Sequence, residues 1–294
     1  MKHFQLISDS GCDFTESEIQ KHDIGVVPFY VTFDQKTHLK EGVDITKDDY
    51  YNRIKTDKSL YPKTAQPSPQ DYMDMYRPYL EAGKNIISLT ISSKLSGTYN
   101  SASLAADMMR DDFPNRTIIV IDSLNASVGQ GLILRELIKM RDKGYSITEA
   151  TNIIEKVIPT AKIYFTLESL EYLRKGGRVG PTTALVGGIL GLRPVLHLVE
   201  GAVEQADSVR GSKKVLKLIG EGVADALKDD AENVDISVGH ILSPDDAQTI
   251  KSDIEDSLNI KIANPIAEVG VTIGSHAGPG ALVVAYCRKF ETFI

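Results

Sequence analysis

Residues 90–98 read Thr-Ile-Ser-Ser-Lys-Leu-Ser-Gly-Thr, a hydroxyl-rich loop with one glycine. The apolar run at 85–89 predicts a short buried strand before this loop, and the spacing of small residues predicts a helix over 99–109 after it. The first N–H groups of a helix are unpaired and attract anions. The hydroxyls around Gly97 therefore fit either an ordinary helix cap or an anion site, and the stretch alone leaves both open.

Length and composition limit the class of protein. The 294 residues suffice for one large or two ordinary domains, and an apolar fraction of 42% can build a large core. The net charge is -7 and the lysines and arginines are scattered, which argues against nucleic-acid binding as the main role. Two cysteines, Cys12 and Cys287, fit a reducing cytosol rather than a disulfide framework.

The sequence shows no sign of secretion or membrane insertion. The opening residues, Met-Lys-His-Phe-Gln, lack a long apolar run after their charge, so we expect no signal peptide and a cytoplasmic protein. The most apolar segment, residues 184–198, is too short to span a bilayer and is interrupted by Arg193 and Pro194.

The first half alternates strands with helices, which is the pattern of a parallel sheet. Residues 4–7 and 26–33 predict strands, and the β-branched run at 117–121 predicts a strand buried on both faces. A capping box that begins at Thr15 starts the first helix. We expect an N-terminal α/β domain over residues 1–160.

The second half has a different pattern. Alternating residues at 194–199 and 202–209, separated by a Glu-Gly turn, predict antiparallel strands. A further strand is predicted at 263–273, followed by a tight glycine- and proline-rich turn around His276. We expect residues 161–294 to form a second α/β domain with a mixed sheet.

Several familiar sites are missing from the sequence. There is no Gly-x4-Gly-Lys-Ser/Thr loop for nucleotide phosphates and no Gly-x-Ser-x-Gly elbow. None of the six histidines is spaced for metal binding with a cysteine, a glutamate or another histidine. We therefore expect neither a metal nor a cofactor.

Three polar residues become a candidate site if the fold brings them together. Thr64 lies at the start of a loop with two prolines, Ser96 lies in the hydroxyl-rich loop, and His276 lies near the C-terminus. Together they would offer hydroxyl and imidazole donors to one small anion. Separately, His276 would be a structural histidine and Thr64 an exposed linker residue. Asp9, at the end of the first strand, fits either the same crevice or simple turn chemistry.

Six motifs occur along the chain in a fixed order and spacing. They are Ser8-Asp9-Ser10-x-Cys12-Asp13, Val27-Pro28-Phe29, Thr64-Ala65-Gln66-Pro67-Ser68-Pro69, Ile91-Ser92-Ser93-x-Leu95-Ser96-Gly97-Thr98-Tyr99, Leu170-x2-Leu173-x-Lys175-Gly176-Gly177-Arg178-Val179 and His276-x-Gly278-Pro279-Gly280. Through these motifs the chain resembles the DegV family, the fatty-acid-binding proteins that include the FakB subunits of bacterial fatty acid kinase.

The resemblance implies a two-domain α/β fold that holds one fatty acid between the domains. Thr64, Ser96 and His276 would hold the carboxylate, and Gly97 would offer its amide. The acyl tail would enter an apolar tunnel, although each candidate wall residue also fits an ordinary core. The candidates are Ile91, Ala184, Leu185, Ile189, Leu190, Leu192 and Leu196.

The resemblance also implies a partner. In the fatty acid kinase system, a separate ATP-binding subunit phosphorylates the bound carboxylate to an acyl phosphate. Arg174, Arg178 and Arg210 are candidates for facing that partner or the phosphate, and a solvated basic face is the alternative.

Our leading hypothesis is a fatty-acid carrier that is not itself an enzyme. A second hypothesis is a lipid-ester hydrolase with Ser96 as nucleophile, His276 as base and Asp9 or Asp122 orienting the base. A third is a sensor or structural module whose ligand is incidental.

Overall fold

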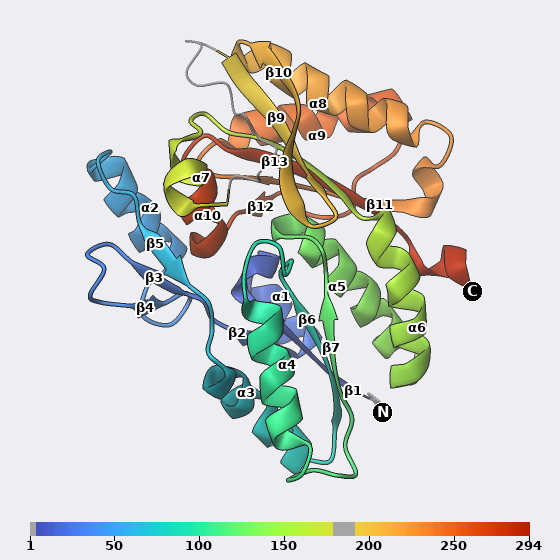
Figure 1. Ribbon diagram of the computed structural model, residues 1–294. Coiled ribbons are helices and arrows are strands. Elements are labelled where there is room, and N and C mark those ends of the chain that lie inside the picture. The colour runs from blue at the N-terminus through green and yellow to red at the C-terminus, as the bar shows by residue number, and fades with distance from the viewer. Residues whose placement is uncertain (1–3, 179–191) are drawn as a thin grey trace.

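Two β-sheets organise the protein, one from each half of the chain. The computed structural model describes residues 4–178 and 192–294. Helix α5 (Ser127–Asp142) runs between the two sheets (Figure 1). This is the two-domain α/β architecture that the sequence predicts, with a parallel N-terminal sheet and a mixed C-terminal sheet.

The N-terminal sheet has four parallel strands in the order β2-β1-β6-β7. They are β1 (Phe4–Asp9), β2 (Ile24–Val27), β6 (Asn85–Thr90) and β7 (Ile118–Asp122). Ser8 pairs with Leu89, so the carboxyl ends of β1 and β6 lie side by side. The loops that follow these strands therefore meet at one edge of the sheet, where ligands bind in open α/β sheets.

Helices cover both faces of this sheet. The helices of the N-terminal half are α1 (Glu16–His22), α2 (Lys47–Thr56), α3 (Pro69–Glu81), α4 (Thr98–Met109), α5 and α6 (Ile147–Val157), with a 3-10 turn η1 (Ser10–Cys12). Ile7 and Ile86 pack with Tyr76 of α3 and Ala105 of α4. Leu6 and Ile87 point to the opposite face, because side chains alternate along a strand, and they belong to the core that contains α5.

The C-terminal sheet has six strands in the order β10-β9-β8-β13-β11-β12. They are β8 (Lys162–Thr166), β9 (Leu192–Val199), β10 (Ala202–Arg210), β11 (Val234–His240), β12 (Ala267–Glu268) and β13 (Leu282–Arg288). Neighbouring strands are antiparallel except β11 and β12. Helices α8 (Ser212–Leu227) and α9 (Pro244–Leu258) lie on one face and α5 on the other (Figure 1).

The remaining short elements connect these layers. They are α7 (Glu171–Gly176), η2 (Ile158–Thr160), η3 (Ala231–Asn233) and η4 (Phe290–Phe293). The first sheet ends with β7 and the second begins with β8, while the domain boundary at residue 160 stays a prediction. Across residues 4–178 and 192–294, no helix has the length and apolar character needed to cross a bilayer.

The strand predicted over residues 26–33 is wrong, because the chain changes sheets in the middle of it. β2 ends at Val27, and β3 (Tyr30–Thr32) joins β4 (Leu39–Lys40) and β5 (Lys63–Ala65) in a separate antiparallel sheet. Pro28 has no N–H to continue the ladder. The N–H of Phe29 donates instead to the hydroxyl of Ser10. The small sheet places Thr64 on β5, opposite Val31.

The strand predicted over residues 263–273 is also wrong. Only β12 is extended there, and Val271–Ala277 form helix α10. The β-branched residues at its start favour a strand locally. However, the Glu41 carboxylate accepts hydrogen bonds from the N–H groups of Val271 and Thr272 and from the Thr272 hydroxyl. A partner distant in sequence therefore caps the helix, and His276 lies in its last turn.

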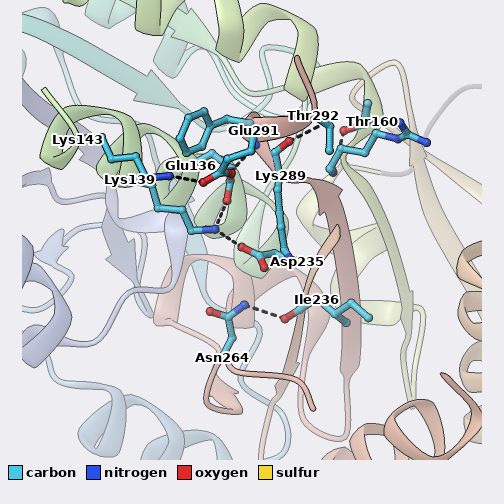
Figure 2. Close-up of polar contacts among 12 residues, drawn as sticks. Glu136, Lys139, Lys143, Thr160, Asp235, Ile236, Asn264, Lys289, Glu291 and Thr292 are labelled. Carbon is cyan, nitrogen blue, oxygen red and sulfur yellow. Dashed lines mark hydrogen bonds and ion pairs between the residues drawn. The ribbon is translucent and has the colours of Figure 1, made fainter. Parts of the chain in front are cut away.

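A buried polar network fixes the C-terminus against α5 and β11 (Figure 2). The Glu136 carboxylate on α5 accepts from Lys139 Nζ at 2.6 Å and from the Phe290 N–H at 2.7 Å. Lys139 also pairs with Asp235 of β11. Glu136 is fully buried, and burial raises its pKa to about 7 despite the neighbouring lysine.

We expect Lys139→Met to lower the free energy of unfolding by about 2 kcal/mol, because it leaves two carboxylates facing each other without their shared cation. The loss is limited because Glu136 can take up a proton. Urea unfolding at neutral pH measures the change. The matched control is Arg110→Ala, which removes an exposed pair with Asp107 and should cost less than about 0.5 kcal/mol. Equal losses in the two variants would contradict this account of the network.

Candidate functional site

A cavity lies between the two domains. Its wall is mostly apolar and comes from both halves of the chain. Representative residues are Phe29, Ile91, Leu95, Phe165, Leu198 and Val283. Such a cavity removes apolar ligand surface from water, and it needs polar partners only where the ligand itself is polar.

The polar residues of the wall come from segments distant in sequence. Thr64 of β5, Ser96 of the loop before α4 and His276 of α10 all line the cavity. The Thr64 hydroxyl and His276 Nε2 are 2.8 Å apart and share a hydrogen bond. The structure thus brings together the three residues that the sequence analysis singles out, although their role with a ligand stays a prediction.

The hydroxyl-rich loop does not cap α4 through a side chain. Gly97 is the N-cap residue and has no side-chain cap bond. The Ser96 hydroxyl is 2.7 Å from that of Thr98 and shares a hydrogen bond with it. Because a hydroxyl has one donor and two acceptor positions, this pair still leaves one hydrogen for a ligand.

His276 is held neutral by its surroundings. Burial of the ring, followed by the positive charges of Arg178 and Lys63, lowers its pKa to about 3. A neutral imidazole has one donor and one acceptor nitrogen. Nε2 is used by Thr64, while Nδ1 is buried without a hydrogen-bond partner among the described residues. His276 therefore offers the site hydrogen bonding rather than charge.

Arg178, which the sequence analysis names as a candidate for facing the partner or the phosphate, lies in the cavity wall. Its Nη1 donates to the Gly176 carbonyl at 2.6 Å and its Nε to the Leu95 carbonyl at 3.1 Å. Burial lowers the pKa of its guanidinium. Arg174 and Arg210, in contrast, are exposed, and Arg174 is 3.6 Å from Glu171.

The predicted tunnel residues have mixed outcomes. Ile91 lines the cavity. Leu192 and Leu196 do not: both lie on β9, where Leu196 is fully buried in the core. Gly97 is also not a lining residue. The other candidates, Ala184, Leu185, Ile189 and Leu190, lie outside the described residues.

Gln66 is a wall residue that the sequence analysis misses. It lines the cavity beside Thr64, and its Nε2 is 3.1 Å from the Ser101 hydroxyl. A usable signal was present, because residues two apart along extended backbone point to the same side. A strand at Thr64 would have predicted Gln66 next to it.

The geometry does not support the hydrolase hypothesis. The hydroxyl of Ser96 pairs with Thr98, and His276 pairs with Thr64. The Asp9 carboxylate is committed to the Ile91 N–H at 2.8 Å and the Gly11 N–H at 3.0 Å. Asp122 accepts from backbone N–H groups of its own and the neighbouring loop. Neither acid orients the imidazole as a base requires.

Three buried acids, Asp9, Asp13 and Glu41, lie near the cavity, and two of them, Asp13 and Glu41, accept hydrogen bonds from the C-terminal half. Asp13 accepts from the Ser127 hydroxyl and from the Gly270 N–H at 2.8 Å, so it ties the N-terminal loop to α5 and α10. Sequence reasoning leaves Asp9 open between turn chemistry and the crevice, and it does not predict the distant partners of Asp13. No group of three or more potential metal ligands occurs in the part of the chain that the structure describes.

Burial controls the protonation of these acids. It raises the pKa of Asp9 to about 6 and that of Asp13 to about 7, against the opposing effect of their hydrogen-bond donors. The pKa of Glu41 is also raised, mainly by burial. The negative charge of Glu41 adds to the shift of both aspartates.

Comparison with known families supports the resemblance seen in the motifs. The family described as uncharacterised protein, DegV family, matches residues 3–289. A DegV domain-containing protein of Clostridium acetobutylicum is 32% identical over 292 residues, which cover 99% of this chain and 100% of that relative.

Solved structures extend the likeness to the fold. A stearic-acid-binding protein from Eubacterium ventriosum has a TM-score of 0.93 and 32% identity, over 98% of this chain and 99% of that chain. A DegV family protein from Thermus thermophilus, whose structure reports fatty-acid binding, has a TM-score of 0.88 and 30% identity, over 97% of this chain and 99% of that chain. Two proteins that bind fatty acids are therefore similar to this chain over nearly its whole length.

The buried acids predict that stability falls as pH rises between about 4 and about 7. Folding raises the pKa of Asp13, so the native state binds more protons than the unfolded state in that window. Asp13→Asn removes this titration, and an amide can still accept from Gly270 and donate to Ser127. We expect the variant to be more stable at pH 8 by about 1 kcal/mol, with a shallower dependence on pH.

Denaturant unfolding from about pH 5 to about pH 8 measures both effects. The matched control is Asp111→Asn, which makes the same charge change at an exposed position. It should leave the pH dependence as it is. A loss of stability in Asp13→Asn that grows as pH rises would show instead that the ionised carboxylate is the stabilising form.

Proposed function

Because the chain belongs to the DegV family, we propose that it binds one long-chain fatty acid in the cavity between its domains. The observation that carries the proposal is an apolar cavity whose wall also holds the hydroxyls of Thr64 and Ser96 and the imidazole of His276. In this arrangement the tail occupies the apolar part and the carboxylate meets the polar residues.

Energetics favour such a ligand. Each buried methylene contributes about 0.8 kcal/mol, so a long tail contributes on the order of 10 kcal/mol before the costs of association. A buried carboxylate without hydrogen bonds would cost several kcal/mol. The carboxylate therefore needs hydrogen-bond donors more than it needs an opposite charge, and the neutral donors of Thr64 and Ser96 suffice. The nearby Arg178 guanidinium adds a favourable charge at longer range.

We further propose that the protein presents the bound acid to an ATP-binding kinase subunit, which phosphorylates the carboxylate to an acyl phosphate. The resemblance to FakB subunits supports this role, and so does a sequence without a nucleotide-binding loop. Arg174 and Arg210 are exposed, and among the described residues Arg174 has only an exposed pair with Glu171, so both can meet an acidic partner surface. A kinase that works on cytosolic ATP places the protein in the cytoplasm.

Fatty-acid binding is tested on the purified protein. Native mass spectrometry should show one copurifying fatty acid, and titration of the delipidated protein should restore it. We expect Thr64→Val to weaken binding roughly 10- to 100-fold, because it removes a donor to a charged group while keeping the side-chain shape. Ser93→Ala, at an exposed position in the neighbouring loop, is the matched control and should bind as wild type does. A protein that stays free of lipid after titration would refute the proposal.

The kinase role has its own assay. The protein loaded with fatty acid, the ATP-binding subunit of a bacterial fatty acid kinase and labelled ATP should yield acyl phosphate. We expect Arg210→Glu to lower kcat/KM for the loaded protein roughly tenfold without changing its affinity for fatty acid, since a reversed charge acts on partner encounter. Arg110→Glu, at the exposed C-cap position of α4, is the control. If the protein binds fatty acid normally but no acyl phosphate forms, the kinase role is refuted and the protein is a carrier that serves a different partner.

A further inference from the structure

Gly176, the last residue of α7, packs directly against the imidazole of His276. A Cβ at this position would lie 2.2 Å from Nδ1 and 3.0 Å from Cε1 of the ring. Real side chains do not approach so closely, so any residue other than glycine has to displace the ring. Gly176 has no positive φ, and its requirement is therefore one of space rather than of backbone conformation.

The adjacent glycine shows the opposite requirement. Gly177 has a φ of +72° and ends α7 in the left-handed conformation. A Cβ there would meet no atom of the described part of the chain within 4 Å. Of this pair, Gly177 is needed for the backbone conformation that ends α7, whereas Gly176 is needed for its contact with His276 in the cavity wall.

The contact with Gly176 also decides which nitrogen of His276 carries the proton. The missing Cβ points at Nδ1, so a Cα hydrogen of Gly176 takes that direction. Nδ1 has no hydrogen-bond partner among the described residues. A proton on Nδ1 would have no acceptor within residues 4–178 and 192–294, whereas an unprotonated Nδ1 accepts a weak C–H contact. The proton therefore belongs on Nε2, which donates to Thr64 Oγ1.

This tautomer sets the direction of the Thr64 hydroxyl. Once Thr64 accepts from Nε2, its own hydrogen is free to point into the cavity. Helix α10 does not move away from the contact freely, because Gly274 lies against the Tyr51 hydroxyl of α2, which also donates to the Val269 and Gly270 carbonyls. A methyl group at Gly176 therefore moves the imidazole rather than the helix.

We propose that Gly176 is a positioning residue, which seats His276 so that its Nε2–H fixes Thr64 as a hydrogen-bond donor to the ligand carboxylate. The inference rests on the proposed fatty-acid site but concerns a residue that need not touch the ligand. It assigns the first glycine of the Gly-Gly-Arg motif to head-group recognition.

A double-mutant cycle tests the proposal with fatty-acid affinity as the readout. Gly176→Ala should weaken binding roughly tenfold, which is the net loss of one directed hydrogen bond. In a His276→Ala background the same change should weaken it less than about twofold, because the ring that it displaces is gone. Gly177→Asn, which tolerates a positive φ, is the matched control and should bind as wild type does.

Each outcome of the cycle decides the question. Equal losses in both backgrounds, or no loss in either, would overturn the proposal. If Gly176→Ala folds only when His276 is also replaced, the ring is shown to be the obstacle and the proposal stands. Failure to fold in both backgrounds would show that Gly176 serves α7 alone.

A second measurement is independent of the ligand. Nitrogen-15 NMR of the delipidated protein should show His276 protonated at Nε2 near neutral pH, and Gly176→Ala should change the shifts of both ring nitrogens. Protonation at Nδ1 in the wild type would overturn the inference. If the wild type binds no fatty acid but shows the expected tautomer, the proposed function fails while the placement of the ring by Gly176 holds.

Discussion

The site depends on one hydrogen bond, that between Thr64 and His276. It joins β5 of the small N-terminal sheet to α10 of the C-terminal half, and it lies in the wall of the cavity between the domains. A neutral imidazole and a hydroxyl can satisfy a buried acid head group without adding a second buried charge. The two halves of the chain therefore have to be correctly docked before the polar residues of the cavity exist as a unit.

The docking is itself held by buried acids. Asp13 and Glu41 reach from the N-terminal half to the first N–H groups of α10, where a carboxylate meets the positive end of the helix. Their pKa values are raised, so burial disfavours the ionised carboxylates more strongly than these hydrogen bonds favour them. The acids thus lower stability near neutral pH, and what they provide is the position of α10 and of His276 within it.

The sequence predicts elements that carry their own signals. The capping box at Thr15 is present with both of its hydrogen bonds, and strands β1, β6 and β7 lie where apolar runs place them. The prediction that β7 is buried on both faces is wrong, because β7 is the edge strand of its sheet and is mostly half-buried. The sequence-based prediction is wrong at β3 and α10. The first leaves its sheet at Pro28 for partners in another, and the second is a β-branched segment capped by Glu41 from a distant loop. β3 pairs with the strand that carries Thr64, and α10 carries His276. The sequence therefore identifies these site residues but does not predict how their side chains are oriented.

In the cavity wall, Arg178 provides a positive charge and His276 provides a neutral hydrogen-bonding group, a difference that the sequence alone does not reveal. The guanidinium is held by the carbonyls of Gly176 and Leu95, and its charge helps to keep the imidazole neutral. A protonated histidine would have to donate from both nitrogens, and Nδ1 faces Gly176, which has no acceptor to offer in that direction. The contact with Gly176 therefore favours a neutral His276 that carries its proton on Nε2. This tautomer in turn sets the direction of the Thr64 hydroxyl.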